Sequence, residues 1–464
     1  MKLRQEAKLI ILMLLCSSIL LIPHVVRKIS NPNPIGLDTY YHLRSIESFK
    51  QHGIQREDNL IFGSRPYKIN IIDLVMSLMP NTSFLVEFLP FFLGTLSVFL
   101  LYLILREVEI ESNTVFSIIV VLIASPIFIY SFTVFSEIPF LVFLLFLATY
   151  LLLKNRYIVS TLILCVLLIL NIQIIPFIAL LLALYYKFER GKTNWRLLVA
   201  AVIMVALVVS TRLNSVSELF SDLSLKRFIA DFGSELGFGI FGLCLSSIGL
   251  LYSWKNKKEY YIIYLTLLIF TPIVLVIHEF IIFLELLLAY FAGIALAKIY
   301  NRKWGVSILK TYSILLIVCG LMFSSISFID REINFPPYKE EILSLNWLKS
   351  NSTKDDVVLS HYKYGYLIQS VSERSVVADK IYFLTSKQKT RINDVNLIFN
   401  SRHLEDAQNL LNKYNISYIW INGAMKQGEV WRRDDEGILF LLSNSEKFKR
   451  VYEYHGVEIW SYEK

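Results

Sequence analysis

Long apolar runs dominate the first two thirds of the chain. They recur from position 8 to position 329 and are separated by short polar or basic segments. A run of about 20 apolar residues is long enough to cross a bilayer as a helix. From Asp330 onward such runs stop. The pattern therefore predicts a polytopic all-α membrane domain at 1–329, followed by a soluble domain at 330–464.

The apolar runs predict eleven membrane spans. The segment 157–187 is the least regular, because Asn171 and Pro176 interrupt it. The first run is longer than the core of a signal peptide and has no small-residue cleavage site, so it is interpreted as an anchor. The predicted spans are 8–26, 84–105, 115–133, 138–153, 157–170, 172–187, 197–213, 236–254, 259–277, 280–299 and 307–329.

Basic residues predict how these spans are oriented. One set of loops carries 17 Lys and Arg, whereas the short loops of the opposite set carry 3; the long segment 27–83 raises the second number to 10. Lys and Arg in short loops favour the cytoplasmic side. We therefore predict a multi-pass protein of the cell membrane with a cytoplasmic N-terminus. The loops 27–83 and 214–235 and the domain 330–464 are then extracytoplasmic.

The soluble domain has the pattern of an α/β fold. Segments 336–351 and 401–415 have helical periodicity, and the first of them begins with two prolines. Short β-rich runs follow the alternation expected of strands. They are 355–360, 375–379, 416–421 and the two halves of 450–462, which predict a hairpin around His455 and Gly456.

Composition narrows the function classes. Of 464 residues, 55% are hydrophobic and 18% are charged, fewer charges than a soluble protein of this length carries. The net charge of +8 lies in the membrane part, because the tail holds 19 basic and 19 acidic residues. This balance argues against nucleic-acid binding. The four cysteines lie inside apolar runs, without disulfide or zinc spacing.

Ionisable residues cluster on the predicted outer side. "GLDTYYHLRSIESFKQHG" (36–53) is predicted to continue as an amphipathic helix, and it places Asp38 ahead of His42 and Arg44, just after the first span. "NSVSELFSD" (214–222) places Glu218 in the second outer loop. Glu137 and His278 lie near the outer ends of other spans. A carrier more often places ionisable groups in the middle of its spans.

These motifs resemble those of the catalytic subunits of oligosaccharyltransferases, in the GT-C glycosyltransferase superfamily. The resemblance implies that Asp38 and Glu218 are catalytic residues. It also implies that Asp38, Glu137 and Glu218 bind a divalent cation, Mn²⁺ or Mg²⁺. Substrate contacts are implied for His42, Arg44, His278 and the tail segment "HYKYG", in which His361, Lys363 and Tyr364 stand where the family has a Trp-Trp-Asp-Tyr-Gly element.

The implied reaction moves a sugar or oligosaccharide from a polyprenyl-phosphate or -pyrophosphate carrier to an extracytoplasmic acceptor, which is a peptide, glycan or lipid. A divalent cation suits this chemistry because it neutralises the phosphate leaving group. The sequence departs from the family where Pro139 replaces a second acidic residue, where His278 replaces an arginine, and at Lys363. These departures leave three alternatives: a single-sugar transferase, a non-catalytic relative that binds lipid-linked glycans, and a transporter.

Overall fold

A computed structural model describes residues 2–190, 199, 203, 225–380 and 386–463. The chain forms two compact units. The first contains residues 1–27 and 87–334, and the second contains residues 28–86 and 335–464. Most of the segment 27–83, interpreted from sequence as a loop of the membrane domain, thus belongs to the same unit as the tail. The predicted boundary between 329 and 330 lies close to residue 334, after which the chain passes from the first unit to the second.

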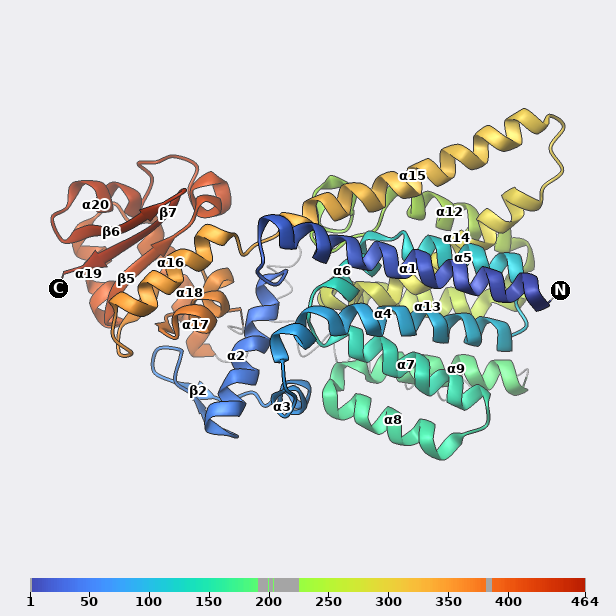
Figure 1. Cartoon of the computed structure of the whole chain (residues 1–464), viewed down its shortest axis with the longest axis horizontal. Helices are drawn as coiled ribbons and strands as arrows, with labels where there is room; N and C mark the ends of the chain where they lie inside the picture. Colours follow the sequence, from blue (N-terminus) through green and yellow to red (C-terminus); the bar gives the residue numbers. More distant parts are fainter. Residues whose placement is uncertain (1, 191–198, 200–202, 204–224, 381–385, 464) are drawn as a thin grey trace. The chain divides into compact units, whose positions relative to one another are not determined.

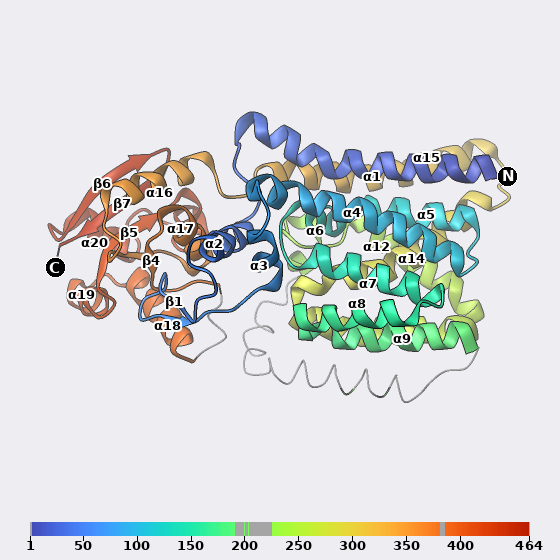
Figure 2. The ribbon, with the colours of Figure 1, turned by 60° about the horizontal axis from the view of Figure 1, so that its bottom comes forward.

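The first unit consists of helices that lie side by side (Figures 1 and 2). Four helices are long and apolar enough to cross a membrane within the described residues, and the pair α5 and α6, bent by 66°, raises that number to five. Eleven spans remain a prediction, because several of the predicted spans are helices of only 14–16 residues. The unit includes α1 (Lys2–Ser30), α4 (Thr82–Glu107), α5 (Ser112–Ile123), α6 (Pro126–Thr133), α7 (Ile138–Leu153), α8 (Tyr157–Leu170), α9 (Ile175–Arg190), α12 (Ile240–Ser253), α13 (Lys257–Val276), α14 (Ile281–Asn301) and α15 (Ser307–Ile333).

Helix α14 is central to the first unit and packs against α12 and α5. Two glycines permit this close packing. A Cβ atom on Gly249 would lie 1.9 Å from the carbonyl oxygen of Phe291, and one on Gly293 would lie 2.3 Å from Ile118. Side chains at these two positions would force the helices apart, so glycine sets the spacing around α14.

The second unit is built on a five-stranded mixed sheet with the order β4-β3-β5-β7-β6. β3 is parallel to β4 and β5, and β7 is antiparallel to β5 and β6. The tail strands lie where the alternation predicts them, including the hairpin around His455 and Gly456. The bounds are β3 (Val357–Leu359), β4 (Ser375–Val376), β5 (Ile416–Ile421), β6 (Phe448–Tyr454) and β7 (Val457–Tyr462).

Helices cover the sheet. α16 contacts β6 and β7, α19 contacts β5, and α20 contacts β6. The indole N–H of buried Trp420 on β5 donates to Ser344 on α16 at 2.9 Å, which joins the sheet to that helix. The tail helices are α16 (Lys339–Asn351), α17 (Gly365–Ser372), α18 (Ser386–Asn400), α19 (Leu404–Lys413) and α20 (Ile438–Asn444).

Residues 28–86 extend this unit. They contribute α2 (Leu37–His52), β1 (Glu57–Asp58), β2 (Arg65–Pro66) and α3 (Ile71–Ser77). α2 packs against α17 and α3. The chain after β1 runs along β4, where the N–H of Phe62 donates to the carbonyl of Val376 at 2.9 Å and the N–H of Val376 donates to that of Leu60 at 3.1 Å. The edge of the sheet is therefore lengthened by a segment from the other end of the chain.

Candidate functional site

Helix α2 positions three of the predicted site residues. It begins after Gly36, which has a φ of 83°, and places Asp38 in its first turn. A carboxylate in the first turn is stabilised by the partial positive charge of the helix N-terminus. His42 follows one turn later, and Arg44 lies two residues beyond. His42 and Arg44 are buried, whereas the side chain of Asp38 is 43% exposed.

Asp38 forms an ion pair that the sequence does not predict. The ammonium of Lys380 donates to Asp38 Oδ1 at 2.5 Å, and the Lys380 side chain is 34% exposed. Lys380 follows Asp379 directly in the chain. The residue expected to face the acceptor and the cation is thus paired with a positive charge from the tail.

His42 is paired with a second acidic residue that the sequence analysis missed. Its Nδ1 lies 2.7 Å from Oδ1 of Asp73 on α3, and the side chains are 6% and 0% exposed. Within the described residues, the other carboxylate oxygen of Asp73 is buried without a hydrogen-bond partner. A carboxylate on one ring nitrogen fixes the orientation of a histidine and selects its tautomer. A lone aspartate in the predicted outer loop gives no sequence signal for this role.

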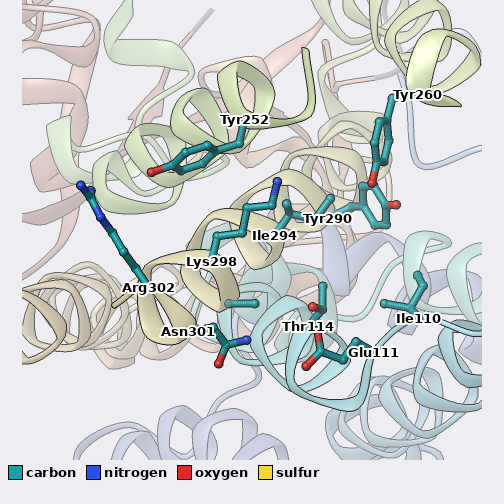
Figure 3. A pocket seen from close by; sticks show the side chains of 11 residues that line it. Ile110, Glu111, Thr114, Tyr252, Tyr260, Tyr290, Ile294, Lys298, Asn301 and Arg302 are labelled. Atoms are coloured by element: carbon teal, nitrogen blue, oxygen red, sulfur yellow. The ribbon is translucent and has the colours of Figure 1, made fainter. Parts of the chain in front are cut away.

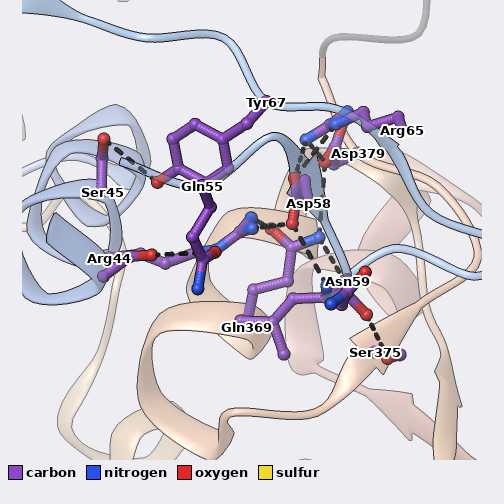
Figure 4. Close-up of polar contacts among 12 residues, drawn as sticks. Arg44, Ser45, Gln55, Asp58, Asn59, Arg65, Tyr67, Gln369, Ser375 and Asp379 are labelled. Carbon is purple, nitrogen blue, oxygen red and sulfur yellow. Dashed lines mark hydrogen bonds and ion pairs between the residues drawn. The ribbon is translucent and has the colours of Figure 1, made fainter. Parts of the chain in front are cut away.

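Arg44 belongs to a buried polar network (Figure 4). Its guanidinium donates to Gln369 on α17 and to Asp58 on β1. Arg65 on β2 donates to Asp58 at 3.1 Å. The predicted substrate contact of Arg44 stays a prediction, but both terminal nitrogens of this guanidinium are engaged inside the protein.

The network continues into the tail. Arg65 binds both oxygens of Asp379, at 2.8 and 2.6 Å, in the paired geometry that favours arginine over lysine. Burial by itself lowers the pKa of Arg65, but the carboxylates of Asp379 and Asp58 outweigh burial and raise this pKa overall. The charged form is therefore the stable one, and the network ties residues 44–65 to residues 369–379.

The described residues contain no group of three or more His, Cys, Asp or Glu side chains placed to hold a metal ion. Glu218 lies outside the described residues. Glu137 precedes α7 in the first unit and accepts a hydrogen bond from the Asn171 amide at 3.1 Å. Among the predicted ligands that the structure describes, Asp38 and Glu137 are both partly exposed and offer the carboxylate oxygens that Mg²⁺ and Mn²⁺ prefer, so their chemistry fits the implied cation. Oδ1 of Asp38 is paired with Lys380.

His278 lies in the first unit, just before α14. Its Nε2 lies 3.1 Å from the carbonyl oxygen of Leu236, and its ring packs edge-on against Phe228. Within the described part of the chain, its Nδ1 is buried without a hydrogen-bond partner. The backbone contact thus uses one ring nitrogen only. Contact of His278 with a lipid-linked phosphate stays a prediction.

The tail element 361–365 forms a short 3-10 turn that leads into α17. The hydroxyl of Tyr364 donates to Glu429 at 2.6 Å, and the ammonium of Lys363 lies 3.1 Å from the same carboxylate. Burial, reinforced by Glu429, raises the pKa of Tyr364 well above its ordinary value. Burial, reinforced by Lys363, lowers the pKa of His361 although Glu429 opposes this change.

Glu429 lies far from this element in the sequence, and sequence reasoning missed it. Its carboxylate partly neutralises the positive charge expected from Lys363. Tyr364 is 1% exposed and packs against Trp420, so it is a wall of the core as well as a hydrogen-bond donor. Substrate contacts by His361, Lys363 and Tyr364 stay predictions.

The first unit also contains a cavity of about 730 Å³ (Figure 3). It is lined by the C-terminal part of α14, the end of α12, the start of α13 and the segment that leads into α5. Tyrosines and charged side chains dominate its wall. The lining residues are Ile110, Glu111, Thr114, Tyr252, Tyr260, Tyr290, Ile294, Ala297, Lys298, Asn301 and Arg302.

No family model matches the chain, and no curated protein matches it in sequence. Solved structures do match. The apo oligosaccharyltransferase of Archaeoglobus fulgidus is 14% identical with a TM-score of 0.61, over 98% of this chain and 74% of that chain. The oligosaccharyltransferase AglB of the same organism, bound to an inhibitory peptide and a dolichol-phosphate, is 13% identical with a TM-score of 0.61, over 100% of this chain and 74% of that chain.

A third structure, the A. fulgidus oligosaccharyltransferase with Zn and sulfate, is 14% identical with a TM-score of 0.61, over 97% of this chain and 73% of that chain. At this level of identity the likeness shows the fold. That fold extends over nearly the whole chain, through the apolar helices and the mixed sheet.

Proposed function

Starting from the fold of an archaeal oligosaccharyltransferase, we propose that this protein is a membrane glycosyltransferase. It transfers a sugar or oligosaccharide from a polyprenyl-phosphate or -pyrophosphate carrier to an acceptor outside the cytoplasm. The fold likeness over 98% of the chain supports this proposal most strongly. The A. fulgidus protein has been solved with dolichol-phosphate and with a tethered acceptor peptide that contains an NVT sequon.

The roles of individual residues in this proposal are those that the resemblance implies. Asp38, on an exposed first turn, faces the acceptor and binds Mn²⁺ or Mg²⁺ together with Glu137 and Glu218. Such a cation supplies neutralisation of the leaving phosphate when it is bound. His42, oriented by Asp73, and Arg44 lie on the same helix and shape the site beside Asp38. His278 contacts the phosphate of the donor.

The acceptor is recognised in the second unit by the element 361–365. Tyr364 lies beneath this element as part of the core, and Lys363 with Glu429 supplies a partly exposed mixed charge pair. The carboxylate of Glu429 thus offsets the positive charge of Lys363 at this element. In the predicted topology, the element 361–365 and the loop 27–83 both lie outside the cytoplasm.

A transfer assay tests the proposal. Purified full-length protein receives labelled lipid-linked glycan, Mn²⁺ and a panel of peptide, glycan and lipid acceptors. We expect the label to move to one acceptor class, and we expect Asp38→Asn to reduce that transfer at least about 100-fold. Tight binding of the labelled donor without transfer to any acceptor would contradict the proposed transferase activity and favour the non-catalytic alternative.

One observation favours that alternative. The ion pair between Lys380 and Asp38 occupies a carboxylate oxygen that a catalytic cation needs. A relative that binds lipid-linked glycans without transferring them could keep this pair permanently closed. Binding of donor lipid that is insensitive to Mn²⁺ and unaffected by Asp38→Asn is the signature expected of such a protein.

A further inference from the structure

The contact between Lys380 and Asp38 bears on how the proposed site works. The two side chains meet at 2.5 Å, yet they are 34% and 43% exposed, so neither is locked in the core. Lysine has a flexible four-carbon stem, and its ammonium can move into water without a change in the backbone. The backbone here is well anchored, because the neighbouring Asp379 is held at both oxygens by Arg65.

We propose that Lys380 is a built-in competitor for the cation at Asp38, an inference that rests on the proposed function. In the resting protein its ammonium neutralises Asp38, and a divalent cation binds through Oδ1 only after the ammonium has moved aside. Two positive charges cannot share one carboxylate oxygen without strong repulsion. Lys380 therefore weakens cation binding and keeps the carboxylate paired when no cation is present.

A Mn²⁺ titration of detergent-purified full-length protein tests this inference directly. The electron paramagnetic resonance signal of the unbound ion reports how much Mn²⁺ the protein binds. We expect Lys380→Met to bind Mn²⁺ at least about tenfold more tightly than the wild type, the effect of removing a competing charge at contact distance. Lys413→Met is the matched control, because Lys413 forms a 2.6 Å pair with Asp394 in the same unit. It should leave Mn²⁺ affinity unchanged.

Adding Asp38→Asn to Lys380→Met should remove the gain in affinity. Lys380→Gln serves as a second variant in case Lys380→Met does not fold, as judged by thermal unfolding. Equal Mn²⁺ affinity in the wild type and both Lys380 variants, or no Mn²⁺ binding by any of them, overturns the inference that Lys380 competes with the cation. Transfer assays on the same preparations distinguish failure of this inference from failure of the proposed function. Glycan transfer with unchanged Mn²⁺ affinity overturns only the competition by Lys380. A gain in Mn²⁺ affinity without glycan transfer overturns only the proposed glycosyltransferase function.

The cavity in the first unit supports a second, independent inference. It lies where two candidate spans end, because His278–Asn301 ends at the cavity wall and Thr82–Glu107 ends just before Ile110. The ends of spanning helices lie at the level of lipid headgroups. Lys298 lies in the last turn of α14, and Arg302 follows directly after the helix. Lys298 is held over the ring of Tyr252 at 5.4 Å. Figure 3 shows Glu111 beside Thr114, apart from Arg302.

We infer that this cavity binds the headgroup of a membrane phospholipid that has both a phosphodiester and a hydrogen-bond donor. The phosphate binds Lys298 and Arg302, since cations and phosphate pair strongly at the membrane surface. The donor, an ammonium or a hydroxyl, binds the acceptor-only carboxylate of Glu111. Tyrosines also line this cavity, and their hydroxyls suit a headgroup more than an acyl chain.

Native mass spectrometry of detergent-purified protein tests this site. We expect phosphatidylglycerol and phosphatidylethanolamine to be retained at least about fivefold more than phosphatidylcholine, which has no headgroup donor. Lys298→Gln with Arg302→Gln should remove retention of all three. Lys303→Gln, a neighbouring exposed cation that does not line the cavity, is the control.

Glu111→Gln should abolish the preference over phosphatidylcholine. Equal retention of the three lipids by the wild type, or unchanged retention by the double variant, overturns the inference. Displacement of the lipids by millimolar inorganic phosphate would show that a free phosphate, and not a lipid headgroup, is the occupant, and it would overturn the lipid assignment.

Discussion

His42 and Asp73 form a buried pair in which Nδ1 of the imidazole lies 2.7 Å from Oδ1 of the carboxylate. The pair joins α2, which carries Asp38, to α3. Asp73→Ala leaves the ring nitrogen without its partner in a buried setting, which costs about 1–3 kcal/mol of unfolding free energy. Asp73→Asn keeps the shape and one acceptor oxygen, and we expect a smaller loss. Chemical denaturation of both variants measures the difference; equal losses would contradict the role of the hydrogen bond.

Asp38→Asn should reduce transfer at least about 100-fold, the scale of removing one preorganised electrostatic group from a reaction site. The change keeps the size of the side chain and removes its charge. The matched control is Asp394→Asn, which breaks a Lys–Asp pair of similar length elsewhere in the unit. Initial rates with labelled donor test this prediction. Full activity of Asp38→Asn would remove Asp38 from the catalytic residues.

Arg65→Ala should destabilise the second unit by about 3–5 kcal/mol, because it leaves Asp58 and Asp379 buried without their shared cation. Lys349→Ala is the control. It breaks the Lys349–Glu373 pair, in which both side chains are 46% exposed, and exposed pairs contribute at most about 1 kcal/mol. Urea unfolding followed by the fluorescence of buried Trp420 and Trp431 compares them. Similar losses for the two variants would show that the buried network contributes little.

Glu341 predicts a pH dependence of the second unit. Burial raises its pKa to about 7, although the N–H of Tyr338 and the amide of Asn422 lower it. The folded state therefore holds the proton up to higher pH than the unfolded state does. Its stabilising contribution is complete below the ordinary pKa of a glutamate and is lost as the pH rises through about 7, by at most about 3 kcal/mol.

Urea unfolding at pH 4.5, 6 and 7.5 measures this dependence, with the buried tryptophans as the probe. Glu341→Gln has no proton to release, so we expect it to flatten the slope over that range. A wild-type protein whose stability rises steadily from pH 4.5 to 7.5, and a variant that follows the same curve, would show that other groups control the dependence.

The topology predicts which positions react with a membrane-impermeant thiol reagent. In a cysteine-free background, Asn351→Cys on the exposed end of α16 should be labelled in intact cells. Gly305→Cys, in the predicted cytoplasmic loop before α15, should be labelled only after permeabilisation; a side chain there meets no atom within 4 Å. Asn351 is a better position than Asn415, whose φ of 50° suits asparagine. The reverse labelling pattern would invert the topology.

The sequence predicts what depends on local pattern. The hairpin around His455 and Gly456, the strand 416–421 and the helix that carries Asp38 follow from alternation, turn residues and helical periodicity. The partners of the site residues do not follow from local pattern. Gln369 reaches Arg44 from 325 positions away, and Lys380 reaches Asp38 from 342 positions away. Such pairs arise only from the tertiary fold, so the sequence placed Asp38, His42 and Arg44 on one helix but left their neighbours unknown.

The number of membrane spans is the other feature that the sequence alone does not determine. Hydropathy identifies apolar segments but cannot say whether a helix such as α8, with 14 residues, crosses the bilayer or is broken within it. Glycines that set helix spacing, such as Gly249, are likewise visible only once α12 and α14 are packed together.

The segment that runs along β4 also constrains the order of folding. Residues 60–62 complete the edge of a sheet whose own strands are among the last parts of the chain to be made. This segment is synthesised before β4, the strand that it pairs with. The helices of the first unit lie between the two in the sequence, so they are also made before β4. Contacts between such distant parts form slowly, because a long loop must close first. The acidic and basic residues that surround Asp38 are therefore assembled late, and the carboxyl-terminal residues cannot form the complete unit without a segment made long before them.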